Sequence, residues 1–98
     1  MCKEINDKSF DETIQDGKKV LIDFFTPWCK FCPTVESSLE RLSNSGVKIF
    51  KVDISKSPNV ASKYSIMSVP TVMAFKDGEI AGTLTGVRKE SEYEKLVN

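Results

Sequence analysis

Apolar residues in this chain form short runs that alternate with segments of helical spacing. The most apolar run spans residues 19–25 and is interrupted by Asp23. Such a run is typical of a central strand that is buried on both faces. Apolar residues then recur every three or four positions, at Phe31, Val35, Leu39 and Leu42. The pattern predicts a buried strand that turns into a helix reaching about Ser43.

The remaining elements follow from the same pattern. Strands are expected over residues 2–5, 47–54, 71–75 and 80–85, and helices over residues 8–16, 57–64 and 90–97. Asp7 or Ser9 can cap the first of these helices, and Ser9 with Glu12 fits a capping box. Ser57-Pro58 is typical of an N-cap followed by a first-turn proline. Asp77-Gly78 indicates a tight hairpin turn.

This order of elements predicts an α/β fold in a single domain, residues 1–98. The first three strands alternate with helices, so we expect them to be parallel and joined by right-handed crossovers. The hairpin then adds antiparallel strands. The result is a mixed central sheet with helices on both faces, although the pattern alone does not give the order of the strands.

Composition excludes several classes of function. Lys+Arg and Asp+Glu both number 14, and this balance favours neither nucleic acid nor an anionic membrane as a partner. The chain has no histidine, which removes the usual general base and most zinc sites. No apolar run approaches the roughly 18 residues of a membrane span, and the first residues lack the apolar region of a signal peptide. We therefore expect a cytoplasmic protein.

Two cysteines, Cys29 and Cys32, lie at the expected junction between strand and helix. Unpaired backbone N–H groups and the helix dipole favour an anion at the start of a helix. We therefore expect the pKa of Cys29 to lie below the value of about 8.5 for free cysteine, and the neighbouring Lys30 ammonium acts in the same direction. Cys32 is near enough to resolve a mixed disulfide formed at Cys29. The pair predicts a thiol–disulfide oxidoreductase.

Metal binding is the alternative for a CxxC pair. A structural metal site needs about four ligands, whereas Cys29, Cys32 and Cys2 supply three at most in one chain. Only a site shared between two copies would suffice, so we expect no metal. Cys2 is interpreted as a free, inert residue of the first strand, which could form intermolecular disulfides only if it were exposed.

Asp23 is an acid in the middle of the most apolar strand. Burial would raise its pKa, and a carboxyl group beneath the thiols could exchange protons with Cys32. The alternative is that Asp23 points to solvent from a partly exposed strand. Lys51, on a strand expected to be its neighbour, is a candidate partner for Asp23.

Two further features have open interpretations. Pro70 stands at the start of a strand, and the base rate of about 5–6% for cis X–Pro bonds favours a trans peptide. An apolar group surrounds the cysteines in sequence or in the expected fold: Trp28, Phe31, Met67 and Val69. These side chains either plug the core or form a contact surface for a protein substrate.

Several segments together resemble thioredoxin. They are Phe24-Phe25-Thr26-Pro27-Trp28-Cys29-x-x-Cys32, Lys51-Val52-Asp53-Ile54, Lys63-Tyr64-Ser65-Ile66-Met67-Ser68-Val69-Pro70-Thr71, and Phe75-Lys76-Asp77-Gly78 with Gly86. They occur in the order of the family and cover essentially the whole chain. A single CxxC is weak, but its joint spacing with Asp23 and Val69-Pro70-Thr71 is a strong signature.

The resemblance implies a thioredoxin fold, a five-strand mixed sheet flanked by four helices, with the third strand between the first two. It implies that Cys29 attacks, Cys32 resolves, and Asp23 transfers protons with help from Lys51. Against the base rate, it implies a cis peptide before Pro70. The implied substrate groove is lined by Trp28, Phe31, Val69, Pro70 and Gly86.

The resemblance also implies partners. These are client proteins that contain disulfides, and a thioredoxin reductase as the electron donor. The protein itself is expected to be a monomer without a cofactor, whose only redox group is its Cys29–Cys32 disulfide. The Lys30-Phe31 spacer departs from the usual Gly-Pro of the family, which leaves the redox potential and the direction of electron flow open. Phe31 should add apolar contact surface, and Lys30 should favour clients with acidic flanks. A glutathione-dependent glutaredoxin is the nearest alternative, although Trp28-Cys29 fits thioredoxin better.

Overall fold

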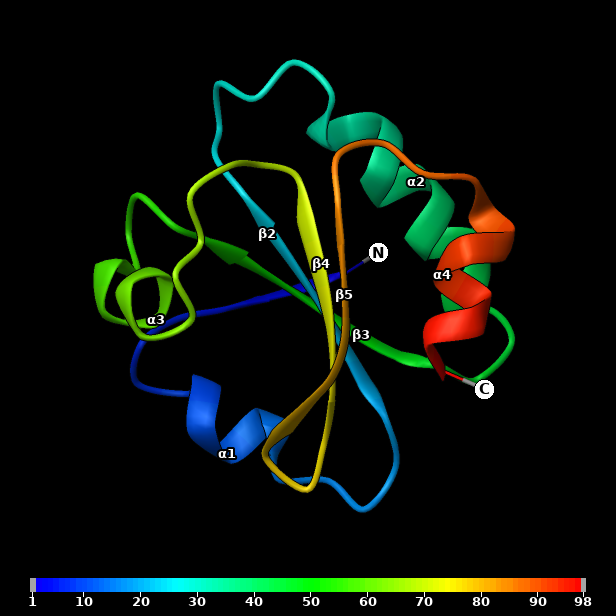
Figure 1. The fold of residues 1–98 in the computed structure, drawn as a ribbon, viewed down its shortest axis with the longest axis horizontal. Coiled ribbons are helices and arrows are strands. Elements are labelled where there is room, and N and C mark those ends of the chain that lie inside the picture. Colours follow the sequence, from blue (N-terminus) through cyan, green and yellow to red (C-terminus); the bar gives the residue numbers. More distant parts are fainter. Residues whose placement is uncertain (1, 98) are drawn as a thin grey trace.

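The computed structural model describes residues 2–97, which form five strands and four helices (Figure 1). In chain order they are β1 (Lys3–Ile5), α1 (Phe10–Ile14), β2 (Val20–Phe25), α2 (Cys32–Ser43), β3 (Lys48–Asp53), α3 (Pro58–Lys63), β4 (Thr71–Lys76), β5 (Glu79–Thr85) and α4 (Glu90–Val97). All the expected elements are present. The largest change is in α1, which is shorter than the helix expected over residues 8–16.

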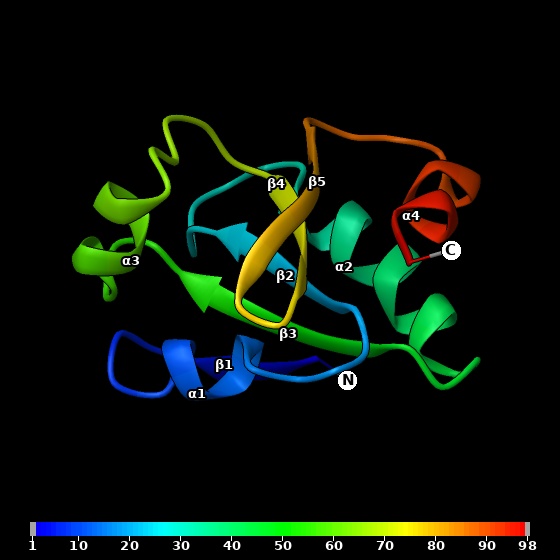
Figure 2. The same cartoon turned by 60° about the horizontal axis from the view of Figure 1, so that its bottom comes forward.

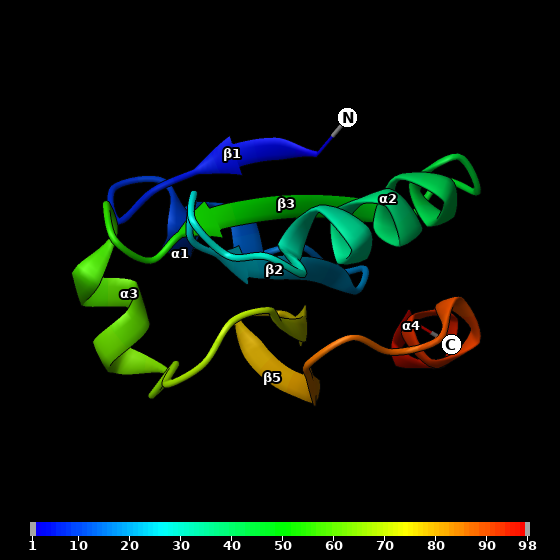
Figure 3. The ribbon, with the colours of Figure 1, turned by 90° about the horizontal axis from the view of Figure 1, so that it is seen from above.

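The strands form one mixed sheet in the order β1-β3-β2-β4-β5, which Figure 3 shows from above. β1 and β2 both run parallel to β3, whereas β4 pairs antiparallel with β2 and with β5. The third strand therefore lies between the first two, as the resemblance implied. β2 occupies the centre, and this explains why its apolar run is continuous.

Helices cover both faces of the sheet, with α1 and α3 on one side and α2 and α4 on the other (Figures 1 and 3). Successive side chains of a strand point to opposite faces. In β2, Ile22 and Phe24 belong to the core beneath α1 and α3, and Leu21 belongs to the core beneath α2 and α4. Asp23 alternates with them and so faces the α2 side.

Two apolar cores result. In the first, the rings of Phe10, Tyr64 and Phe75 lie with centroids 5.3 to 5.6 Å apart. The second includes Val35, Leu39 and Leu42 of α2 together with Tyr93 of α4. Fully burying side chains of this size contributes about 1.5–3 kcal/mol each. The helical spacing read after Cys32 is therefore the face that holds α2 on the sheet.

The expected capping box at Ser9 does not form. Ser9 is the N-cap by position but makes no side-chain cap bond. Its hydroxyl instead accepts the Asn6 N–H at 3.1 Å, within a turn in which the Asn6 side chain accepts the Lys8 N–H at 2.9 Å. The hydroxyl is already engaged in this preceding turn.

Asp7 caps a helix, but not the one beside it in sequence. Its carboxylate accepts the N–H groups of Val60 at 2.9 Å and Asn59 at 3.3 Å, at the start of α3. Ser57, the expected N-cap of α3, keeps that position without a side-chain cap bond. A negative charge at a helix N-terminus also interacts favourably with the helix dipole, so Asp7 ties the loop after β1 to α3.

The hairpin turn is confirmed. Asp77 and Gly78 both have positive φ, 52° and 84°, which is the requirement of a type I′ turn. The turn lies next to the end of α1 in Figure 2. There the N–H groups of Asp77 and Gly78 donate to the carbonyls of Asp16 and Ile14 at 3.1 and 3.0 Å.

Candidate active site

Cys29 and Cys32 form a disulfide, with their Cα atoms 5.4 Å apart. The segment between β2 and α2 turns back on itself, where the Cys29 N–H donates to the Thr26 carbonyl at 3.2 Å. Cys32 is buried, with 5% of its surface exposed, whereas Cys29 is half-buried. The two sulfurs therefore differ in access, and Cys29 is the one that a large substrate can reach.

The helix begins at the second cysteine, whereas Cys29 was expected to lie at the start of the helix. Its first residue is Cys32, with Phe31 as N-cap and Pro33 in the first turn. Cys29 therefore lies in the preceding turn rather than in the helix itself, and its sulfur is held at the helix start by the bond to Cys32. A proline is tolerated here because the first-turn N–H groups have no intrahelical acceptor.

Three of the four apolar residues expected around the cysteines are exposed and do not plug the core, whereas Val69 is half-buried. Exposed fractions are 74% for Trp28, 55% for Phe31 and 93% for Met67. Large apolar side chains left in solvent around a reactive bond indicate a contact surface. The Lys30 ammonium lies 5.7 Å from the centroid of the Phe31 ring, so the spacer presents a cation and an aromatic ring together.

The peptide bond between Val69 and Pro70 is cis. The base-rate expectation of trans was wrong, and the expectation from the resemblance is confirmed. Pro70 is buried and its carbonyl accepts the Gly86 N–H at 2.8 Å. Within residues 2–97 the backbone of Val69 makes no hydrogen bond, which leaves its peptide groups for another chain.

These segments meet at one end of the sheet. Figures 1 and 2 show the loops before α2, before β4 and after β5 close together there. They carry Trp28, Phe31, Val69, Pro70 and Gly86. Gly86 adopts φ +77°, in the left-handed region that favours glycine, and this conformation lets β5 end beside Pro70.

Asp23 is buried, with 1% of its surface exposed, so the alternative of a solvent-facing acid is wrong. Its Oδ1 atom has no hydrogen-bond partner among the described residues. The pKa of Asp23 is raised to about 7, chiefly by burial and also by the Glu36 carboxylate, while the Lys51 ammonium opposes the rise. An acid with such a pKa can both take up and release a proton near neutral pH.

Lys51 lies where the sequence suggested, but its hydrogen bond goes elsewhere. It is directly opposite Asp23 in the pairing of β2 with β3. Its ammonium donates to Glu36 of α2 at 3.1 Å and lies 5.3 Å from the centroid of the Phe25 ring. Lys51 therefore acts on Asp23 through its charge but forms its hydrogen bond with Glu36, a residue that sequence reasoning missed. Its position four residues after Cys32, on the same side of the helix, was the available signal.

Cys2 is buried just before β1 and is the free cysteine among the described residues. Its exposed fraction is 5%. Burial, together with the charges of Glu36, Asp23 and Glu40, raises its pKa to about 11. These observations agree with an inert thiol and remove the condition, exposure, on which intermolecular disulfides depended.

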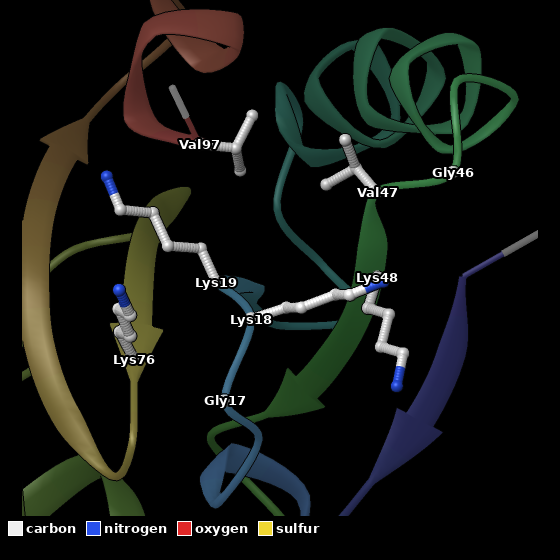
Figure 4. Close-up of a pocket in the computed structure, with 8 residues that line it drawn as sticks. All are labelled: Gly17, Lys18, Lys19, Gly46, Val47, Lys48, Lys76 and Val97. Carbon is white, nitrogen blue, oxygen red and sulfur yellow. The ribbon is translucent and has the colours of Figure 1, made fainter.

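Other kinds of site find little support. No group of three or more potential metal ligands occurs among residues 2–97, and no helix in this part of the chain combines the length and apolarity needed to cross a membrane. A depression of about 580 Å³ is lined by Gly17, Lys18, Lys19, Gly46, Val47, Lys48, Lys76 and Val97. Its lysines point in different directions (Figure 4), and Lys48 is paired with Asp16 at 2.6 Å.

Comparisons with known proteins agree with this geometry. The family model for thioredoxin matches residues 1–98. Thioredoxin of Rickettsia bellii is 36% identical, over 100% of this chain and 97% of the relative. Thioredoxin of Bacillus subtilis is 37% identical, over 94% and 90%.

Solved structures show the same likeness. A point mutant of thioredoxin from Halobacterium salinarum superimposes with a TM-score of 0.89 at 28% identity, covering 97% of this chain and 86% of the other. Mitochondrial thioredoxin 3 of Saccharomyces cerevisiae, in its oxidised form, gives 0.86 at 27% identity, covering 98% and 92%. With its Cys29–Cys32 disulfide, the chain therefore belongs to the thioredoxin family and is a thiol–disulfide oxidoreductase of the protein-disulfide reductase type.

Proposed function

We propose that Cys29 attacks the disulfides of client proteins, that Cys32 resolves the resulting mixed disulfide, and that Asp23 exchanges the proton of Cys32. The unequal exposure of the two cysteines carries this assignment. Cys29 is reachable from solvent, and Cys32 is buried on the face of the sheet that Asp23 shares. The proposed reaction uses no cofactor, because the reduced Cys29/Cys32 dithiol carries the two electrons and the disulfide is what remains after they have been given up.

The reduction takes two exchanges. The Cys29 thiolate attacks one client sulfur, a Cys29–client bond forms, and the other client sulfur leaves as a thiolate that takes a proton. Cys32 then loses its proton to the Asp23 carboxylate and attacks the Cys29 sulfur. The second client thiolate leaves and takes the proton held by Asp23, the first client thiolate having taken its proton from solvent, and the Cys29–Cys32 disulfide remains. Two electrons and two protons pass to the client.

The client segment is proposed to bind as an extended strand beside Val69. The unpaired backbone of Val69 offers the donor and acceptor of a one-residue β-pairing. Trp28, Phe31, Pro70 and Gly86 surround that position. Apolar side chains of the client would cover Trp28 and Phe31, whose exposed rings otherwise stay in water.

The electron donor is proposed to be a thioredoxin reductase, with the protein acting as a cytoplasmic monomer. The bacterial relatives reported above are thioredoxins, which supports this assignment. Reduction rates with thioredoxin reductase and with glutathione, measured on the same oxidised protein, separate it from a glutaredoxin role. Rapid reduction by glutathione alone would reverse the assignment of the donor.

Two substitutions test the division of labour between the cysteines. Cys29→Ser should abolish the reduction of insulin disulfides, because no exposed nucleophile remains. Cys32→Ser should accumulate the mixed disulfide with the client, detectable by mass spectrometry. Cys2→Ser, which alters a buried thiol outside the pair, is the matched control and should turn over normally. Parent-rate turnover by Cys32→Ser would rule out the two-thiol mechanism.

A further inference from the structure

A carboxylate of α2 pairs with the cation that was expected to be the partner of the buried acid. Glu36 and Lys51 are 3.1 Å apart, and their side chains are 25% and 21% exposed. Asp23 is opposite Lys51 in the sheet but is almost completely buried. The ammonium thus lies within the field of two carboxyl groups, and its hydrogen bond goes to the more exposed one.

Because Lys51 bonds to Glu36, Asp23 keeps a buried carboxyl oxygen that accepts no hydrogen bond from the described residues. A buried carboxyl oxygen without a donor destabilises the folded state, and the Oδ1 atom of Asp23 has no partner among residues 2–97. The neighbouring ammonium is the obvious donor, yet it turns to Glu36 and toward the Phe25 ring. Something must therefore make the alternative position of Lys51 more stable than the pair with Asp23.

We propose that Glu36 is a positioning residue that holds the Lys51 ammonium away from Asp23, so that the buried carboxyl group remains unpaired and able to accept the proton of Cys32. This inference rests on the proposed proton exchange between Asp23 and Cys32. It adds a residue of α2 that sets the strength of the base without touching the reacting sulfurs.

The chemistry explains why an unpaired acid is useful. In the resolving step the Cys32 thiol gives its proton to the Asp23 carboxylate, which becomes a carboxylic acid, and the new thiolate attacks Cys29. A carboxylate tied to an ammonium is a weaker base for this transfer, since an opposite charge within about 4–6 Å favours the ionised form. Diverting Lys51 keeps Asp23 matched to neutral pH.

Other groups around Asp23 do not replace this role. The pairing residue on β4 is the apolar Val72. Cys2, near the start of the chain, has a pKa of about 11 and stays neutral near pH 7. Tyr93 of α4 also feels the charge of Asp23, and burial raises its pKa above the usual value. Glu36 and Lys51 are thus the charged groups that act on Asp23 near neutral pH.

Titration of Asp23 tests the proposal directly. The oxidised protein is used, because Cys29 and Cys32 then do not titrate, and the carboxyl carbon of labelled Asp23 is followed by NMR. Glu36→Gln should lower the pKa of Asp23 by about one unit, within the effect of a nearby opposite charge. Glu40→Gln removes a carboxylate one turn further along α2 that is not among the groups acting on Asp23, and it should leave the titration unchanged.

A double substitution shows whether Glu36 acts through Lys51. In the Lys51→Met background, Glu36→Gln should lower the pKa of Asp23 by less than it does in the wild-type protein, because no cation remains to be released toward Asp23. The pH midpoint of the resolving step, measured in single turnover on the reduced proteins, should move in parallel. An unchanged titration in Glu36→Gln, an equal shift in Glu40→Gln, or a shift by Glu36→Gln that is as large in the Lys51→Met background as in the wild-type protein would each overturn the proposal. If Asp23→Asn left the pH profile of resolution unchanged, the proposed function of Asp23 would fail instead.

Discussion

Replacing Asp23 by asparagine should stabilise the folded protein above neutral pH and leave its stability unchanged in acid. The pKa of Asp23 rises from 3.8 to about 7 on folding, chiefly through burial. One unit of pKa corresponds to about 1.4 kcal/mol. The rise therefore corresponds to about 4 kcal/mol, which is the cost of keeping an ionised Asp23 in the folded state.

The direction with pH follows from proton binding. Between about pH 4 and pH 7 the folded state holds the Asp23 proton while the unfolded state has released it, so the wild-type protein loses stability as the pH rises. Above pH 7 both states are ionised and the full cost applies. Asparagine has nearly the same shape and never ionises, so the variant escapes this loss.

The measurement is urea unfolding of the oxidised protein and of Asp23→Asn at several pH values from 4 to 8.5. All other titrating groups are shared, so the difference between the two curves isolates Asp23. It should be near zero at pH 4 and approach about 4 kcal/mol at pH 8.

Asp53→Asn is the matched control. Asp53 is also buried, but its Oδ1 atom accepts the backbone N–H and the hydroxyl of Ser55 at 2.9 and 2.6 Å. Its replacement should bring no gain at any pH, because it weakens charge-assisted bonds. A difference for Asp23→Asn that stays flat across the pH range would refute the reasoning.

Two further predictions concern Lys30, in the spacer of the disulfide, and the buried Cys2. Lys30 is the one charged residue in the segments 26–33, 65–70 and 85–87, so the wild-type kcat/KM should favour peptide disulfides with aspartate flanks over lysine flanks by about two- to fivefold, as an exposed charge pair contributes about 0.2–1 kcal/mol. Lys30→Glu should reverse this preference, and a preference unaffected by the substitution would count against it. Native Cys2 should resist iodoacetamide at pH 7.5, because it is buried with a pKa of about 11. Mass spectrometry showing alkylation at the rate of a free cysteine would contradict its burial.

The sequence pattern predicted a helix, strand or turn correctly where contacts between residues close in the chain determine it. The positive φ values of Asp77 and Gly78 follow from the turn type that joins adjacent antiparallel strands. The continuous apolar run of β2 marked it as a strand with both faces covered. The capping assignments failed for the opposite reason. Asp7 caps α3 across more than fifty residues of chain, and no local motif records such a distant acceptor.

The site shows the same division. The spacing of Cys29 and Cys32 predicted a redox pair, because two intervening residues suffice to bring the sulfurs together. The partner of Lys51 was assigned only in part, since strand pairing placed it opposite Asp23 but the packing of α2 brought in Glu36. The choice between a core plug and a contact surface for Trp28 also needed the fold.

By itself, then, the sequence determined the order of elements, the redox pair and the acid on the central strand. It did so because spacing along a backbone with fixed periods dictates which neighbours share a face. Only the tertiary structure decided which groups are exposed and which cation meets which carboxylate, and the cis Val69–Pro70 peptide was expected from the family resemblance but not from local sequence rules. Those outcomes depend on the packing of segments that are distant in the chain, where small differences in burial and charge select one arrangement among several that the local sequence allows.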